Sequence, residues 1–216
     1  MAGASVYCDQ TGGDYYDYLP LPGGRLGVLV ADASDHGVGA ALHMTTTRAL
    51  LRAGSRDYTR PEGWLRQVNT QLVRDIGDTG RFVSIFFCEI DPRRRILRWV
   101  RAGHDPALLY DPERDRFTEL GGEGTALGIE EAAVLATQER EGWSAGAGLV
   151  RVTDGVRETR DARGAMFGGE RLRQTVRACA RQPAAAVRDA VLAACDAFRQ
   201  TAPRHDDLTV VAVKLA

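Results

Sequence analysis

The order in which two kinds of apolar pattern follow one another along the chain is the feature that most restricts its fold. Short alternating or continuous apolar runs, which are typical of β-strands, occupy the beginning and the middle of the chain. Longer segments with helical period lie between these two groups of strands, and again just before a last strand. A fold of parallel strands would alternate strands and helices one by one, so this order predicts an α+β fold.

Element boundaries follow from these patterns and from the Gly, Pro and Asp residues between them. The predicted strands cover residues 5–8, 26–31, 82–90, 96–102, 107–110, 134–138, 149–152 and 208–213. The predicted helices cover residues 39–53, 61–76 and 170–200, the last divided at Gln182-Pro183. Residues 111–115 form a predicted hairpin turn. We expect the two helical groups to cover opposite faces of two stacked antiparallel sheets, with a core that includes Val28, Val30, Phe86, Val100, Val152 and Val211.

Composition narrows the class of protein. The chain has 216 residues, of which 44% are hydrophobic and 26% charged, and it contains no low-complexity linker, so we expect one domain over residues 1–216. The net charge of −1 provides no broad field for nucleic acid or anionic membranes. Since no apolar run approaches the ~20 residues of a membrane span, and no basic and apolar leader pattern starts the chain, we expect a cytoplasmic protein without a membrane span.

The four cysteines exclude several kinds of site. Cys8, Cys88, Cys179 and Cys195 are widely spaced and form no Cys-x-x-Cys pair, which disfavours a zinc ribbon or a dithiol redox centre. None of them begins a Cys-x₅-Arg loop, which disfavours thiolate phosphatase chemistry. We expect reduced, mostly packed thiols.

Acidic residues gather where apolar strands end. They occur in the segments 12–17, 30–37, 152–155 and 205–209, three of which contain Gly. Carboxylates brought together repel one another unless protons or a cation neutralise them, and a set of oxygen ligands suits Mg²⁺ or Mn²⁺. From the residues alone, two interpretations stay open: a hard-metal site built from these loops, or separate turns and helix caps.

Six segments, in order, carry a family resemblance. They read Gly-Gly-Asp-Tyr-Tyr-Asp, Ala-Asp-Ala-Ser-Asp-His-Gly-Val-Gly-Ala-Ala, Arg-Phe-Val-Ser-Ile-Phe-Phe, Arg-Ala-Gly-His-Asp-Pro, Thr-Asp-Gly-Val-Arg-Glu and Asp-Asp-Leu-Thr-Val-Val. Together they resemble the SpoIIE/RsbU-type branch of the PPM family of metal-dependent serine/threonine phosphatases, over residues 5–215. The resemblance implies a four-layer αββα sandwich, two antiparallel sheets flanked by helices, with a centre of two or more Mn²⁺ or Mg²⁺ ions.

The resemblance also assigns site residues. Asp32 matches the carboxylate that bridges both metals, and the backbone carbonyl of Ala33 is a ligand of one of them. Asp154 and Asp206 match the later metal-binding positions, while Asp14 matches the acidic residue that reaches the second metal directly or through water. Two lesser candidates are Asp17 and Asp207.

Two residues differ from the family pattern, and two histidines are further candidate site residues. Relatives usually have Gly at the position of Asp35 and Asn at that of Asp105; neither change removes a core ligand, and we expect catalytic competence. His36 could donate a proton to the leaving serine oxygen, or could be a helix-start or solvent-facing residue. His205 could orient Asp206, or could face solvent.

The function implied by the resemblance is hydrolysis of phosphoserine or phosphothreonine on a partner protein by a metal-activated water. For this branch the substrate is a STAS-type anti-sigma-factor antagonist, and a sensory domain with a helical linker precedes the catalytic module in the full-length protein.

Two other functions compete with this one. A pseudophosphatase would bind the same partner without turnover, although the retained aspartates argue against it. A nucleotide cyclase is suggested by Gly12-Gly13-Asp14, but such enzymes need an alternation of helices and strands that this chain lacks.

Overall fold

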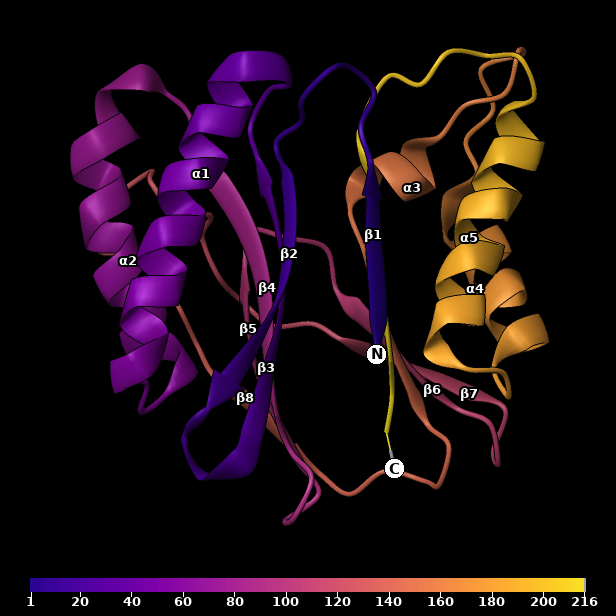
Figure 1. Cartoon of the computed structure of the whole chain (residues 1–216), viewed down its shortest axis with the longest axis horizontal. Helices are drawn as coiled ribbons and strands as arrows, with labels where there is room; N and C mark the ends of the chain where they lie inside the picture. The colour runs from indigo at the N-terminus through magenta and orange to yellow at the C-terminus, as the bar shows by residue number, and fades with distance from the viewer. Residues whose placement is uncertain (216) are drawn as a thin grey trace.

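Two five-stranded β-sheets lie face to face in the computed structural model, which describes residues 1–215 (Figure 1). Sheet A has the strand order β1-β10-β9-β6-β7, and its strands are β1 (Ala2–Val6), β6 (Ala107–Asp111), β7 (Arg116–Leu120), β9 (Gly148–Val152) and β10 (Leu208–Lys214). Sheet B has the order β2-β3-β4-β5-β8, and its strands are β2 (Asp14–Leu21), β3 (Arg25–Ala33), β4 (Val83–Asp91), β5 (Ile96–Ala102) and β8 (Gln138–Glu141). The strand pairs within both sheets are antiparallel.

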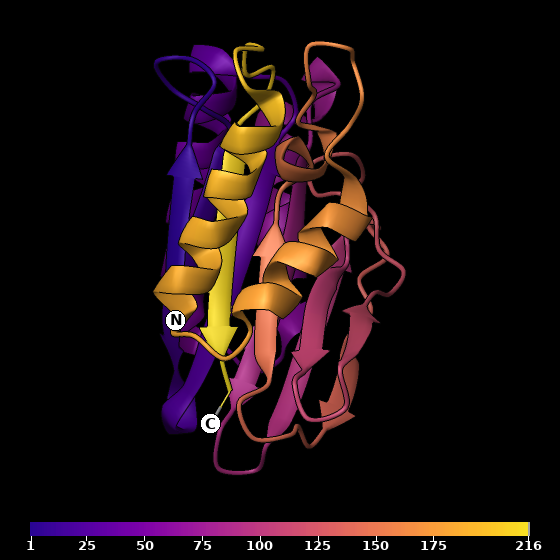
Figure 2. The same cartoon turned by 90° about the vertical axis from the view of Figure 1, so that its right-hand side faces the viewer.

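Helices form the two outer layers (Figure 2). Sheet B is covered by α1 (Gly37–Gly54) and α2 (Pro61–Ile76), and sheet A by α4 (Gly168–Cys179) and α5 (Ala184–Arg199). The shorter helical segments are η1 (Pro22–Gly24), η2 (Ser55–Asp57), η3 (Gly77–Thr79) and α3 (Asp154–Glu158). No helix within residues 1–215 combines the length and apolar character needed to cross a membrane. The predicted αββα sandwich is confirmed.

The alternation of side chains along each strand explains the layers. In β3, Val28 and Val30 face the opposite sheet, whereas Leu29 and Ala31 face α1 and α2. Both faces of the strand are therefore covered, and its apolar run is continuous rather than alternating. The residues predicted for the core are all buried: Val28, Val30, Phe86, Val100, Val152 and Val211.

Several predicted boundaries are wrong. The first strand covers Ala2–Val6 rather than residues 5–8, and the strand expected at 134–138 lies instead at Gln138–Glu141. The predicted strands also omit β2, because its three tyrosines and two aspartates interrupt the apolar pattern. The division of residues 170–200 into two helices is confirmed.

The two ends of the chain meet in sheet A. β1 pairs with β10 so that Ser5 lies opposite Thr209, and their hydroxyl groups are hydrogen-bonded at 2.7 Å. This pairing brings the Gly-rich loop after β1 next to the acidic loop before β10. Two of the four acidic segments are thereby placed side by side, although nearly the whole chain separates them.

Candidate metal centre

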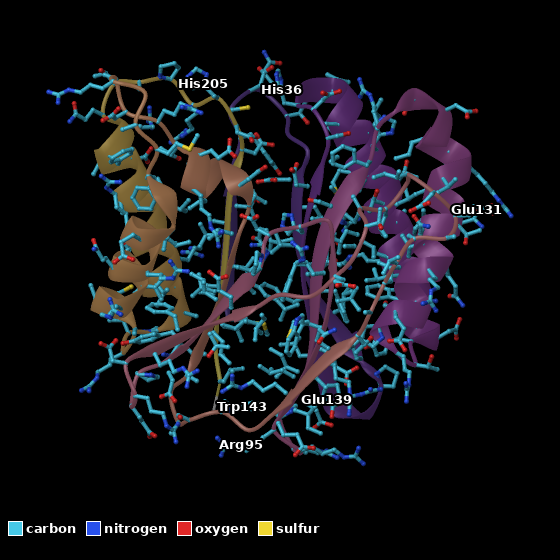
Figure 3. All side chains as sticks on the ribbon, turned by 180° about the vertical axis from the view of Figure 1, so that it is seen from behind. His36, Arg95, Glu131, Glu139, Trp143 and His205 are labelled. Carbon is cyan, nitrogen blue, oxygen red and sulfur yellow. The ribbon has the colours of Figure 1, made fainter. Side chains whose placement is uncertain are left out.

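The four acidic segments converge at one end of the sandwich. Asp14 begins β2, Asp32 lies near the end of β3, Asp154 begins α3 directly after β9, and Asp206 precedes β10. Figure 3 labels His36 and His205, which mark this end from the sides of the two sheets. The antiparallel sheets thus deliver side chains from both halves of the chain to one edge.

A cleft of about 490 Å³ opens between these segments. It is lined by Asp32, Ala33, Ser34, Asp35, His36, Phe82, Ser84, Gly103, His104, Asp105, Asp154, His205 and Asp206. Four of the residues assigned by the resemblance, Asp32, Ala33, Asp154 and Asp206, are therefore brought together, and His36, the candidate proton donor, lines the same cleft. Those at the rim, including Asp154 and Asp206, are exposed, so the cleft is accessible from solvent.

Asp14 lies behind the cleft rather than on its wall. It stands opposite Asp32 in the register of β2 and β3, and only 6% of it is exposed. The hydroxyl of Thr153 donates a hydrogen bond to Asp14 Oδ2 at 2.8 Å. Asp14 is thus positioned beside the carboxylate that the resemblance makes the bridging ligand, and it is held by a residue that immediately precedes Asp154.

Asp207 connects the loops that carry the other aspartates. Its carboxylate accepts hydrogen bonds from the backbone N–H groups of Cys8, at 2.9 Å, and Asp14, at 3.5 Å, and the side chain is buried. A Cβ atom on Gly12 would stand 1.8 Å from Asp207 Oδ2, and one on Gly155 would stand 2.2 Å from the Asp207 carbonyl oxygen. Glycine is needed at both positions because the carboxylate of Asp207 approaches Gly12 this closely and its backbone carbonyl approaches Gly155. The contacts indicate that Asp207 holds the loops together.

Uncompensated negative charge dominates the electrostatics of the cleft. Burial, and then repulsion from the neighbouring aspartates, raises the pKa of Asp32 to about 9. Burial also raises the pKa of Asp14 to about 7 and that of Asp206 to about 6. A bound cation would oppose these upward shifts, because it stabilises the ionised form of each carboxylate.

The donor chemistry fits a hard divalent cation. The acidic side chains and the Ala33 carbonyl offer oxygen ligands only, which suit Mg²⁺ or Mn²⁺ better than zinc. Among residues 1–215, no three His, Cys, Asp or Glu side chains already stand close enough to form a complete ligand set.

Three further aspartates have partners of their own. Asp17, a lesser ligand candidate, forms two hydrogen bonds of 2.7 Å with the guanidinium of Arg52 and also accepts one from Tyr15. It therefore lies in an ion pair with α1 and not on the wall of the cleft. The two residues that depart from the family pattern are also ion-paired: Asp35 with Arg81 at 3.4 Å, and Asp105 with Arg157 at 3.1 Å.

The histidines occupy different environments. His36 is exposed at the N-cap of α1 and makes no side-chain capping bond, and His205 is exposed on the opposite wall of the cleft. His104 is buried, with its Nδ1 2.7 Å from Ser84 Oγ. Burial and the nearby arginines hold its pKa well below the usual range, so the ring is neutral.

The sequence analysis missed Ser84 and His104 as parts of the cleft. Ser84 stands opposite Asp32 in the register of β3 and β4, so Asp14, Asp32 and Ser84 form one row across three strands. Ser84, a polar residue near the start of the apolar run of β4, was the available signal. Its meaning depends on the register, which only the structure provides.

Comparison with known proteins identifies the family. The model of the family described as "Stage II sporulation protein E (SpoIIE)" matches residues 22–216. The chain belongs to the SpoIIE family. Among curated proteins, it is 24% identical over 160 residues to "Phosphoserine phosphatase RsbU" of Bacillus subtilis, which covers 74% of this chain and 47% of RsbU. The chain spans less than half the length of the curated relatives it matches.

Solved structures share the fold of this SpoIIE-family chain. The SiaA-PP2C domain of Pseudomonas aeruginosa superimposes with a TM-score of 0.86 at 23% identity, covering 99% of this chain and 86% of that domain. RsbX, solved in complex with magnesium, gives a TM-score of 0.72 at 14% identity over 99% of this chain and 94% of RsbX.

Proposed function

We propose that the chain is the catalytic domain of a metal-dependent protein phosphatase that hydrolyses phosphoserine or phosphothreonine on a partner protein. The observation that carries this proposal is the convergence of Asp32, Asp154 and Asp206, from three separate elements, on one solvent-accessible cleft. Membership of the SpoIIE family and similarity to RsbU, named as a phosphoserine phosphatase, support the same activity.

The chemistry follows from the residues of the cleft. Asp32, Asp154, Asp206 and the Ala33 carbonyl would hold two or more Mn²⁺ or Mg²⁺ ions, with Asp14 behind Asp32. Such ions lower the pKa of water and neutralise phosphoryl oxygens. His36, exposed on the same cleft, would donate a proton to the leaving serine oxygen. Water and the phosphoester are consumed, and the serine hydroxyl and inorganic phosphate are formed.

The proposed substrate is a phosphorylated STAS-type anti-sigma-factor antagonist. This part of the proposal rests on the family resemblance, and the partial coverage of the relatives is consistent with a catalytic module that works within a longer signalling protein. The exposed rim, which carries His36, Asp154 and His205, leaves room for a loop of a protein substrate.

The test is phosphate release from a phosphorylated STAS protein with Mn²⁺, with Mg²⁺ and after chelation. We expect release that requires a divalent ion. Binding of the STAS protein without release, under saturating metal, would establish the pseudophosphatase instead. Consumption of a nucleoside triphosphate in a parallel assay would establish the cyclase.

A further inference from the structure

A second, smaller cavity lies directly beside the metal cleft. Its volume is about 130 Å³, and it is lined by Gly155, Glu158, Thr159, Arg160, Arg199, Pro203, Arg204, His205, Asp206 and Leu208. Two of these residues, His205 and Asp206, line the metal cleft as well. The two hollows are therefore neighbours that share one wall, formed by the loop before β10.

Guanidinium groups outnumber carboxylates around this cavity. Arg160, Arg199 and Arg204 line it, against Glu158 and Asp206. Asp196, which is not among the lining residues, accepts hydrogen bonds from two of these arginines through one carboxylate oxygen. The distances are 2.8 Å from Arg199 Nε and 2.9 Å from Arg204 Nη2. With Asp196 included, three guanidinium groups meet three carboxylates, so a metal that neutralised Asp206 would leave positive charge in excess.

The arginines also have donors without acceptors. Arg204 Nε is buried and lacks a hydrogen-bond partner within the described chain, although buried polar groups are nearly always satisfied. Arg160 is exposed and donates one hydrogen bond, from Nη1 to the carbonyl of Gly164 at 3.1 Å. An acceptor that entered the cavity would accept charge-assisted hydrogen bonds from the guanidinium groups that line it.

The size of the cavity restricts what it can hold. Sites for cofactors and drug-sized ligands typically measure ~300–1,000 Å³, so about 130 Å³ suits a single side-chain head group. A basic head group would meet three guanidinium groups, and an apolar one would leave their donors unsatisfied. A carboxylate matches both the charge and the fork of an arginine.

We propose that this cavity is a specificity subsite that receives the carboxylate of an acidic residue close to the phosphorylated serine of the substrate. The inference rests on the proposed phosphatase function, since a phosphoserine held at the metal cleft places its neighbours in the chain over the shared wall of His205 and Asp206. An extended chain advances by ~3.3–3.6 Å per residue, so a residue only a few positions away reaches the cavity.

The experiment uses two short peptides that differ only beside the phosphoserine, one with Glu on both sides and one with Gln. Phosphate release gives kcat/KM for each peptide. Fluorescence anisotropy gives the affinity for the same peptides with the phosphoserine replaced by its non-hydrolysable phosphonate. The whole chain is used as wild type, Arg160→Gln, Arg204→Gln, Arg204→Lys and Arg94→Gln. Arg94 is an exposed arginine in the turn between β4 and β5, next to Arg95, which Figure 3 shows at the far end of the molecule.

For the wild type we expect the Glu peptide to bind about tenfold more tightly than the Gln peptide. Arg160→Gln and Arg204→Gln should each remove most of this preference, whereas Arg204→Lys should retain part of it and Arg94→Gln all of it. Circular dichroism confirms that each variant is folded, and Arg160→Gln provides an independent readout because Arg160 holds no other element in place.

Equal affinity of the wild type for both peptides would overturn the subsite. So would a preference that survives in both Arg→Gln variants. A preference in binding that these variants abolish, together with no phosphate release under saturating Mn²⁺, would support the subsite and refute the proposed phosphatase activity. The two proposals therefore fail in different ways.

Discussion

Asp14 and Asp32 stand directly opposite each other in the antiparallel register of β2 and β3. Adjacent carboxylates on one face of a sheet destabilise it unless they bind protons or a cation. The raised pKa of both groups reflects their burial and the surrounding negative charge. The fold therefore keeps a charge arrangement that is unfavourable on its own and that a divalent cation would relieve.

Asp32→Asn tests the centre of the proposed site. The amide nitrogen cannot bind a cation, and the side chain keeps its size, so we expect the fold to survive and phosphate release to fall at least ~10²-fold. Metal occupancy, measured by calorimetry, should fall for both ions, whereas Asp154→Asn or Asp206→Asn should chiefly empty one. Asp57→Asn, at an exposed aspartate of η2, is the matched control. Near-wild-type turnover by Asp32→Asn under saturating metal would refute the mechanism.

The metal-free chain should lose stability as the pH rises. The pKa of Asp32 lies at about 9 in the folded chain, above its usual value of 3.8, so the folded chain holds a proton that the unfolded chain releases. The contribution of Asp32 to stability is then fully present below about pH 4 and is lost progressively up to about pH 9. Thermal unfolding in chelator should show the midpoint falling between pH 5 and pH 9, and falling less in Asp32→Asn. A midpoint independent of pH in both proteins would contradict this account.

Gly155→Ala should disrupt the site without removing a ligand. The new Cβ would meet the carbonyl oxygen of Asp207 at 2.2 Å, so α3 and the loop before β10 must move apart. We expect a loss of about 1–3 kcal/mol in the free energy of unfolding and a clear fall in phosphatase activity. Gly63→Ala, in α2 with open space around it, is the control and should be neutral or stabilise by up to about 1 kcal/mol. Equal behaviour of the two variants in denaturant unfolding would show that the contact is unimportant.

Asp17→Asn distinguishes a structural aspartate from a metal ligand. The change weakens a two-bond ion pair with Arg52, whose side chain is half exposed, so we expect a loss of about 1 kcal/mol in stability. Metal affinity, measured by titration calorimetry, should stay unchanged. A marked drop in metal affinity with unchanged stability would restore Asp17 as a ligand candidate.

Much of the fold could be predicted from apolar patterns alone. The strands around Val28, Phe86, Val100 and Val211 have both faces covered, so their continuous apolar runs are strong signals. The helix pair before β10 was likewise visible, because Pro183 interrupts a helical period. β2 gave no such signal, because aspartates and tyrosines interrupt its apolar pattern. It was therefore not among the predicted strands.

The candidate site was predictable in its residues but not in their arrangement. Motif resemblance selected Asp32, Asp154 and Asp206, which line one cleft. The resemblance could not show that two other aspartates have structural roles. Asp17 forms an ion pair with an arginine of α1, and Asp207 holds two loops together through hydrogen bonds. Those distinctions depend on register and on contacts between residues far apart in sequence.

The pairing of the first strand with the last has a consequence for how the protein is made. β10 lies between β1 and β9, so sheet A cannot close until residues 208–214 have left the ribosome. Contacts of such long range form slowly, and β1 stays without its partner until β10 has emerged. Asp206 arrives with that same final segment. The nascent chain thus has an incomplete cleft until this segment has been synthesised and has paired with β1 and β9.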